Sequence, residues 1–360
     1  MVIISSHTFA ASKGPIHYLA AGPTTGPLIV FVHGCPFIAM TWRPQLECFA
    51  NLGFYVAAAD TTGYGQSFNS RQVSDYSMES QVADQLELLS HLGREKAIFV
   101  GHDWGSAIIW SLAAHHPEKC LGVAALGIPY RTVELGLEKL VSTVDRELYP
   151  ETKYPYGQWD YMLYYEQNPE KAEVYFAQHF ERLTKLFTTR YDGLRKASIT
   201  ADLTKTGGFF GSQAPPDLPF EASVLDHEIF NAVVASERNN GSFGIIAYYR
   251  NGVANRAYND PKRCANGAKL DIPCFYLDCS ADLASVNSSS TNWTAEMREL
   301  CSNIFEVQLN CRHMVALEKP TETNALLARW LCEHTQAWPV DRSSGILKPG
   351  NPCTLDRNEI

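Results

Sequence analysis

The sequence lacks any hydrophobic run long enough to cross a membrane, since no stretch of about 18 or more residues is continuously apolar. Residues 1–11 contain no basic segment followed by a long apolar stretch, so no secretory signal is predicted. Basic residues are in deficit: 30 lysines and arginines stand against 39 aspartates and glutamates, which gives a formal net charge of −9. We therefore expect no membrane span, and neither nucleic acid nor an anionic membrane surface as a partner.

Metal-binding patterns are also missing from the sequence. The ten cysteines form no CxxC pair and no Cys/His cluster with the spacing of a zinc site. Without a secretory signal, ten cysteines are more typical of free thiols in a reducing compartment than of a disulfide framework. The sequence therefore predicts a cytoplasmic protein without a metal site.

What the sequence does contain is an alternation of short apolar runs and helical patterns. With 45% hydrophobic and 19% charged residues, its composition is that of an ordinary globular protein. Strands are predicted at residues 16–21, 28–32, 54–59, 97–100, 123–126, 274–277 and 304–309. Helical patterns lie between them, notably at 80–91 and 291–300. This alternation predicts an α/β fold with a mostly parallel sheet and helices on both faces.

One long segment departs from the alternation. Between residues 129 and 261 no run resembles a buried parallel strand, and helical stretches rich in aromatic residues take its place. Within it, the Gly/Pro-rich stretch 204–219 is predicted to be a loop. The sequence thus predicts a core formed by residues 1–130 and 263–335, with a helical lid at 131–262 inserted between the sixth and seventh core strands. Residues 336–360 are expected to form an extended or disordered C-terminal tail.

The most informative motif is Gly-His-Asp-Trp-Gly at residues 101–105. An apolar run precedes it and a helical pattern follows, which predicts a sharp strand–turn–helix connection with Asp103 at its tip. Gly101 and Gly105 would keep this strained turn free of bulky neighbours. A plainer interpretation, an aspartate that caps the following helix, requires neither glycine.

The identity of the residue at the tip restricts the chemistry. Enzymes of this build usually carry serine there, and a serine that attacked an alkyl carbon would leave an ether that water does not readily cleave. A carboxylate instead leaves an ester, whose carbonyl carbon belongs to the enzyme. Asp103 therefore predicts substrates with an electrophilic sp³ carbon, which means epoxides or alkyl halides.

The loop after the predicted strand 28–32 begins with His33 and continues through Gly, Cys35 and Pro36. In this architecture that loop supplies one amide of the oxyanion hole, and the residue after the nucleophile supplies the other. The backbone N–H groups of Cys35 and Trp104 are therefore expected to form the hole.

An acid and a histidine follow the last two predicted strands. Asp282 lies just past strand 274–277 and His313 just past strand 304–309, so the chain order is nucleophile, acid, histidine. We expect His313 to activate water, and Asp282 to orient its ring and stabilise the imidazolium.

Together, these motifs and the inserted lid resemble the epoxide hydrolases of the α/β-hydrolase superfamily, over residues from about 15 to 335. Two lid segments strengthen the match: DYMLYYEQNP at 160–169 is similar to the first lid-tyrosine segment of that family, and YYRN at 248–251 to the second. The resemblance implies that the hydroxyls of Tyr161 and Tyr249 hold the oxirane oxygen. A phenol with a pKa of about 10 can donate to the alkoxide that develops there. The residues expected to line the substrate site are His33, Pro36, Trp104, Tyr161, Tyr249 and Met314.

The sequence departs from the family pattern at several positions. Arg312 and Met314 flank the histidine where the family usually has glycine and an aromatic residue. Ser106 replaces a common second glycine, and Cys35 replaces a common aromatic residue. Every reacting side chain is retained, so these changes bear on the substrate rather than on the mechanism.

The expected activity is the opening of a small, apolar epoxide to a vicinal diol, with water as the other reactant and no cofactor. A haloalkane or haloacid dehalogenase is one alternative, although it would need halide-facing donors rather than two tyrosines. A second is a biosynthetic cyclase or isomerase, in which a hydroxyl of the substrate replaces water. A third is a non-catalytic ligand-binding relative, which would not need five reacting residues. The sequence carries no indication of an oligomeric state.

Overall fold

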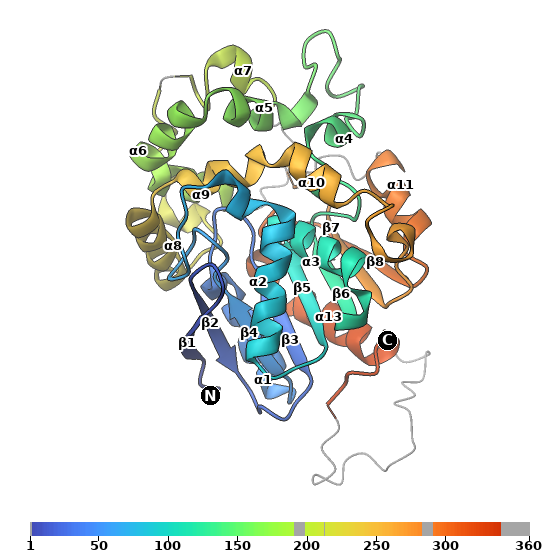
Figure 1. Cartoon of the computed structure of the whole chain (residues 1–360). Helices are drawn as coiled ribbons and strands as arrows, with labels where there is room; N and C mark the ends of the chain where they lie inside the picture. The colour runs from blue at the N-terminus through green and yellow to red at the C-terminus, as the bar shows by residue number, and fades with distance from the viewer. Residues whose placement is uncertain (1, 191–198, 212, 283–290, 340–360) are drawn as a thin grey trace.

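The computed structural model describes residues 2–190, 199–211, 213–282 and 291–339 (Figure 1). In these ranges eight strands form one sheet, in the order β1-β2-β4-β3-β5-β6-β7-β8. The strands are β1 (Ser5–Ala10), β2 (Pro15–Ala21), β3 (Leu28–Val32), β4 (Tyr55–Ala59), β5 (Ala97–His102), β6 (Cys120–Leu126), β7 (Cys274–Cys279) and β8 (Ile304–Leu309). The β1–β2 and β2–β4 pairs are antiparallel, and the other pairs are parallel. The prediction of a mostly parallel sheet is confirmed.

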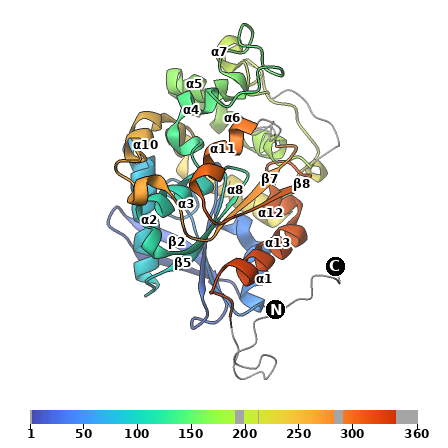
Figure 2. The ribbon, with the colours of Figure 1, turned by 90° about the vertical axis from the view of Figure 1, so that its right-hand side faces the viewer.

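Helices cover both faces of the sheet, because its central strands are apolar on both sides. Along β3, Val30 and Val32 face one hydrophobic core, whereas Ile29 and Phe31 face the other. Helices α2 (Met78–His91) and α3 (Trp104–His115) pack on the first face, and α1 (Arg43–Asn51) and α13 (Pro320–His334) pack on the second. Figure 2 shows the sheet between these two helical layers.

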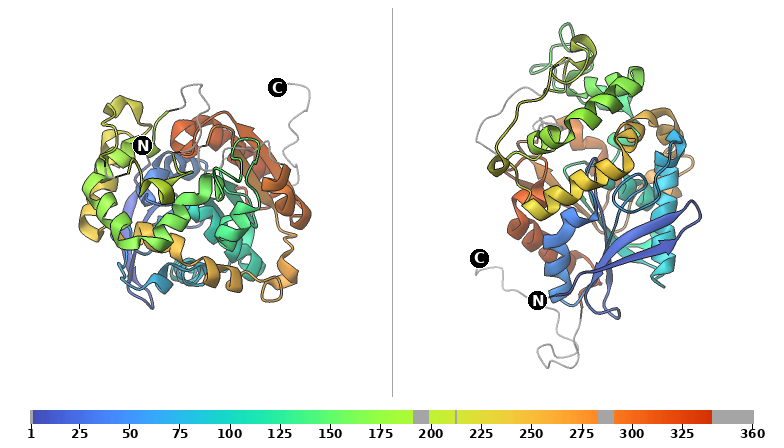
Figure 3. Two further views of the ribbon diagram at one scale, coloured as in Figure 1. Left: turned by 90° about the horizontal axis from the view of Figure 1, so that it is seen from above. Right: turned by 90° about the vertical axis from the view of Figure 1, so that its left-hand side faces the viewer.

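The lid is the helical segment between β6 and β7. Its helices are α4 (Leu137–Val141), α5 (Asp160–Gln167), α6 (Pro169–Phe187), α7 (Leu203–Thr206), α8 (His227–Asn240), α9 (Phe243–Ala247) and α10 (Gly252–Tyr258). Most of this segment lies beyond the end of the sheet at which β5 ends at His102, as the two views in Figure 3 show. The remaining helices, α11 (Thr291–Leu300) and α12 (Val315–Glu318), belong to the second part of the core.

The structure differs from the sequence analysis in two places. Strand β1 was not predicted, because its sequence contains no apolar run; it is an edge strand without a fully buried residue, held by antiparallel pairing with β2. The predicted loop 204–219 is helical only at its start, since α7 ends at Thr206 and is followed by Gly207 in the left-handed conformation (φ 81°), and the described residues from 207 to 219 form neither helix nor strand.

The start of the predicted tail packs on the core. The ring of Trp338 meets that of Phe54 edge to face, with centroids 5.5 Å apart. Residues 340–360 of the tail lie outside the described residues. The nine cysteines within the described ranges are free thiols, as predicted. No helix in those ranges is long and apolar enough to span a bilayer.

Candidate active site

Asp103 lies in the turn between β5 and α3, in a backbone conformation that L-residues rarely adopt (φ 54°, ψ −122°). The turn forms only because its neighbours have no side chain. A Cβ on Gly101 would lie 2.3 Å from the Gly105 carbonyl oxygen, and a Cβ on Gly105 would lie 2.0 Å from that of Val32. A Cβ on Gly34 would lie 2.4 Å from Cβ of Asp103. The strained turn therefore places Asp103 in close contact with the loop after β3, where only glycine fits at position 34.

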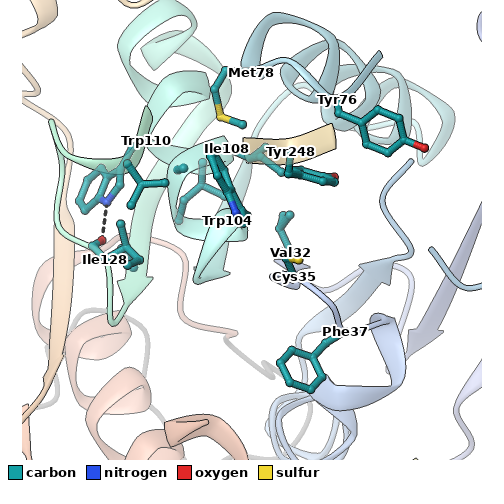
Figure 4. Close-up of a cluster of buried hydrophobic side chains, with 14 of the residues drawn as sticks. Val32, Cys35, Phe37, Tyr76, Met78, Trp104, Ile108, Trp110, Ile128 and Tyr248 are labelled. Carbon is teal, nitrogen blue, oxygen red and sulfur yellow. Dashed lines mark hydrogen bonds between the residues drawn. The ribbon is translucent and has the colours of Figure 1, made fainter. Parts of the chain in front are cut away.

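The two backbone amides predicted to form the oxyanion hole both lie at the Asp103 carboxylate. The Cys35 N–H donates to Oδ1 of Asp103 at 2.9 Å, and the Trp104 N–H lies close enough to this side chain to lower its pKa. Burial alone would raise the pKa of Asp103, but His313 and these contacts lower it below its ordinary value. Figure 4 shows Cys35 and Trp104 in the same buried cluster, with Tyr248 beside the indole. Asp103 is thus an ionised carboxylate within a frame of N–H donors.

His313 lies between the two aspartates. Its Nδ1 is 2.7 Å from Oδ2 of the fully buried Asp282, and its Nε2 is 3.5 Å from Oδ2 of Asp103. Burial lowers the pKa of His313, but the two carboxylates together raise it well above its ordinary value. In the structure as it stands, His313 is therefore a cation that bridges two anions.

The two lid tyrosines meet near the nucleophile. Tyr161 comes from α5 and Tyr249 from the 3-10 turn η7 (Tyr248–Arg250); their ring centroids are 5.3 Å apart. Burial raises the pKa of both phenols well above 10.0, and the charge of Asp103 raises it further. Tyr249 also packs against the edge of Trp104, at 5.1 Å. Both tyrosines therefore keep their protons and are available as donors.

The comparisons with known proteins agree with this geometry. Residues 27–187 match the family model described as the alpha/beta hydrolase fold. Bifunctional epoxide hydrolase 2 of Sus scrofa is 27% identical over 331 residues, which cover 91% of this chain and 55% of the relative. Epoxide hydrolase A of Mycobacterium tuberculosis is 25% identical over 323 residues, which cover 88% of this chain and 94% of the relative. The chain thus spans about half the length of the mammalian relatives it matches, and nearly the full length of the bacterial one.

Solved structures give the same result. Epoxide hydrolase A from Mycobacterium thermoresistibile superposes with a TM-score of 0.70 at 26% identity, covering 91% of this chain and 98% of that one. An epoxide hydrolase from an endophytic Streptomyces gives a TM-score of 0.72 at 25% identity, covering 91% and 95%. The chain has the α/β-hydrolase fold. The resemblance to epoxide hydrolases drawn from the sequence motifs is confirmed.

Two of the residues expected to line the substrate site are enclosed in the loop after β3. His33 is 2% exposed; its Nδ1 donates to the Gly34 carbonyl at 2.9 Å and its Nε2 accepts from the Thr61 N–H at 3.0 Å. Burial lowers the pKa of His33, so the ring is neutral and both nitrogens are occupied by the backbone. Pro36 is buried and follows a cis peptide bond. His33 therefore supports the loop, which corrects the expectation that it binds substrate.

Met314, also expected to contact substrate, is 4% exposed and borders a small internal cavity of about 10 Å³. His33 and His102 line the same cavity. Of the residues expected to line the substrate site, Tyr161, Tyr249 and Trp104 lie together next to Asp103.

Sequence reasoning missed two residues that shape the site. Asp60, directly after β4, is 3% exposed and accepts from His17 Nδ1 at 2.7 Å and from the Ala39 N–H at 2.8 Å, so it ties the loop after β3 to the sheet. The sequence feature that could have indicated this role is an acidic residue at the end of a buried parallel strand. Tyr165, one helical turn after Tyr161, lies 5.2 Å from the ring of Tyr249. The sequence feature that could have indicated Tyr165 is the i, i+4 spacing of two tyrosines, which places both on one face of α5.

Proposed function

We propose that this chain is an epoxide hydrolase, which converts a small, apolar epoxide and water into a vicinal diol. The observation that carries the proposal is the combination of an ionised aspartate with two protonated tyrosines nearby and a His–Asp pair at its side. An epoxide needs a nucleophile at carbon and a proton donor at oxygen at the same moment. Asp103, Tyr161 and Tyr249 supply both from one small volume.

In the first half-reaction, a carboxylate oxygen of Asp103 forms a bond to a ring carbon, and the C–O bond of the oxirane breaks. Oδ1 is held by the Cys35 N–H, so we assign Oδ2 as the attacking atom. The departing oxygen takes a proton from Tyr161 or Tyr249. The product is an ester whose carbonyl oxygen, Oδ1, already accepts from the Cys35 amide, with the Trp104 amide beside the same side chain.

Ester formation changes the state of His313. In the free enzyme the charge of Asp103 helps to hold the His313 pKa high, and the ester no longer carries that charge. His313 therefore loses its proton more readily once the ester has formed. The proton that His313 gives up restores the phenol that donated to the product hydroxyl, so both tyrosines are protonated and His313 is neutral before hydrolysis begins.

In the second half-reaction, neutral His313 takes a proton from a water molecule, which attacks the ester carbonyl carbon of Asp103. The negative charge that develops on Oδ1 is stabilised by the N–H groups of Cys35 and Trp104, which need no rearrangement. Collapse of this intermediate releases the diol and restores the carboxylate. Asp282 keeps the His313 ring oriented throughout, through the contact at Nδ1.

We further propose that the reaction needs no cofactor or metal, because side chains and backbone N–H groups of this protein, together with water, carry out each step. The rings of Trp104, Tyr161, Tyr165 and Tyr249 pack together on the lid side of the nucleophile, and this apolar cluster favours an apolar substrate. Cytoplasm is the proposed site of action, because the free thiols suit a reducing compartment.

The deciding experiment incubates the protein with matched sets of epoxides and alkyl halides and identifies the products. We expect vicinal diols from epoxides, no halide release, and no product from the Asp103→Ala variant. Halide release without diol would instead indicate a dehalogenase. A cyclic ether formed from an epoxide that carries its own hydroxyl would indicate a cyclase, and binding without any conversion would indicate a ligand-binding protein.

A further inference from the structure

His102 directly precedes the nucleophile in sequence and contacts the histidine of the site. Its Nε2 lies 2.7 Å from the backbone carbonyl oxygen of His313, a residue 211 positions away, and the two ring centroids are 4.6 Å apart. A carbonyl oxygen can only accept a hydrogen bond, so Nε2 of His102 carries the hydrogen and donates it. This contact joins the end of β5 to the loop after β8.

We propose that His102 is a positioning residue for His313, which it holds in register with Asp103 through the hydrogen bond from Nε2 to the His313 carbonyl. The inference rests on the proposed function, since it assigns His102 to the hydrolytic half-reaction. His102 touches neither substrate nor water in this role. It fixes the backbone of the base.

Three further backbone hydrogen bonds of the His313 loop run within the second part of the core. The Val315 N–H donates to the His313 carbonyl at 2.9 Å, and the Ala281 N–H donates to the Cys311 carbonyl at 3.0 Å. The Arg312 N–H donates to Glu318 at 2.8 Å. These bonds hold the loop to its own neighbours in the second part of the core. Among the hydrogen bonds to the His313 backbone, the one from His102 comes from the nucleophile turn.

His102 is suited to a passive role because it stays neutral. It is 5% exposed, and burial, together with the adjacent charge of His313, lowers its pKa to about 4. At neutral pH it therefore adds no charge beside His313. With Nε2 occupied by hydrogen, it also offers no basic nitrogen toward the His313 carbonyl.

A small cavity lies next to His102. The cavity has a volume of about 10 Å³ and is lined by Thr41, Trp42 and Met314 as well as His102. The ring of His102 is therefore enclosed by side chains and not by a wide substrate pocket.

Two variants with the same functional group test this role. The amide nitrogen of His102→Gln reaches the position of Nε2, whereas that of His102→Asn reaches only the position of Nδ1. Single-turnover reactions with an epoxide that the wild type converts, followed by intact-protein mass, separate ester formation from ester hydrolysis. We expect His102→Asn to hydrolyse the ester about tenfold more slowly, the rate equivalent of one buried hydrogen bond, with ester formation little changed. His102→Gln should retain hydrolysis close to the wild-type rate.

A second measurement needs no substrate. The proton between Nδ1 of His313 and Asp282 gives a far-downfield NMR resonance when the ring is held in place, and we expect it in the wild type and in His102→Gln but weakened in His102→Asn. Equal hydrolysis rates in the two variants, or an unchanged resonance in His102→Asn, would overturn the role of His102. If the wild type forms neither ester nor diol, the proposed function fails, and the NMR comparison still decides whether His102 positions His313.

Discussion

Oδ1 of Asp103 accepts a hydrogen bond from the Cys35 N–H at 2.9 Å, so the nucleophile rests in the same donor frame that its own tetrahedral intermediate would occupy. A carboxylate held in this way has one oxygen fixed and one oxygen directed toward His313, at 3.5 Å. The structure therefore distinguishes the two oxygens before any substrate binds. This asymmetry underlies the predictions for both half-reactions.

The first prediction concerns the fate of the water oxygen. If water attacks the ester carbonyl, a single turnover in ¹⁸O-labelled water should place the label in the Asp103 side chain, because the diol takes its new oxygen from the enzyme. Mass spectrometry of the peptide that contains Asp103 measures this directly. Label in the first-turnover diol, with an unlabelled peptide, would mean that water attacks the substrate without a covalent intermediate.

The second prediction separates the half-reactions at His313. His313→Gln should still form the ester, but should hydrolyse it so slowly that intact-protein mass increases by one substrate equivalent. Asp282→Asn should slow the same step less severely, because it disturbs the orientation of the imidazole through the contact at 2.7 Å. Normal turnover by His313→Gln would assign the base to another residue.

The third prediction uses the tyrosine pair to distinguish epoxide from halide chemistry. A Tyr161→Phe, Tyr249→Phe double variant keeps both rings and deletes only the hydroxyls, so epoxide opening should fall by about 10²–10⁴. Each single variant should lose less, because the remaining hydroxyl still donates. Stopped-flow measurement of ester formation gives the rates. A double variant that opens epoxides at the wild-type rate would remove the tyrosines from the mechanism.

The fourth prediction follows from the charge of Asp103 beside His313. Asp103→Ala should lower the His313 pKa, measured by NMR titration, because it removes one of the carboxylates that raise it. The same linkage affects stability. Since the folded pKa is raised, the ion pairs contribute fully to the free energy of unfolding below the ordinary histidine pKa of about 6.5, and the contribution is lost as the pH rises toward the folded value. In Asp103→Ala, the free energy of unfolding should therefore decrease less as the pH rises than it does in the wild type. Identical titration in the two proteins would contradict the coupling.

The fifth prediction tests the close approach at the nucleophile turn. A Cβ on Gly34 would lie 2.4 Å from Cβ of Asp103, so Gly34→Ala should displace the carboxylate and slow ester formation, by roughly 10²-fold for a shift of about 1 Å. Gly252→Ala is the matched control, because its Cβ would meet nothing closer than 3.6 Å. An active Gly34→Ala variant would show that the loop after β3 can move away without cost.

Much of this site could be predicted because its residues stand at the ends of strands. The apolar runs of β5, β7 and β8 can be recognised in the sequence. Because the strands are parallel, their carboxyl ends lie on the same side of the sheet, and this brings Asp103, Asp282 and His313 together. The two tyrosines depended on family resemblance, since their spacing in sequence contains no sign that they meet.

The misses have physical causes as well. His33 stands in a loop where a binding role and a supporting role give the same sequence pattern, and only the partners of its two nitrogens distinguish them. Asp60 holds two segments that precede it by accepting hydrogen bonds from His17 and Ala39, which no local pattern reveals. Strand β1 is stabilised by its partner strand rather than by burial, so its polar sequence carries no strand signal.

The pairing of β6 with β7 has a consequence for how such proteins diversify. Leu126 and Leu277 are register partners, so the chain leaves the core for the lid and returns to it along neighbouring strands. The two strands are parallel, so the lid and the connection after it run from the end of β6 back to the start of β7, and this surface segment can be lengthened, shortened or exchanged without altering the sheet. The nucleophile, the acid and the base are all supplied by the core, whereas both phenols are supplied by the lid. A transplanted lid would therefore bring its own proton donors together with its own substrate preference, while ester hydrolysis would stay with the recipient.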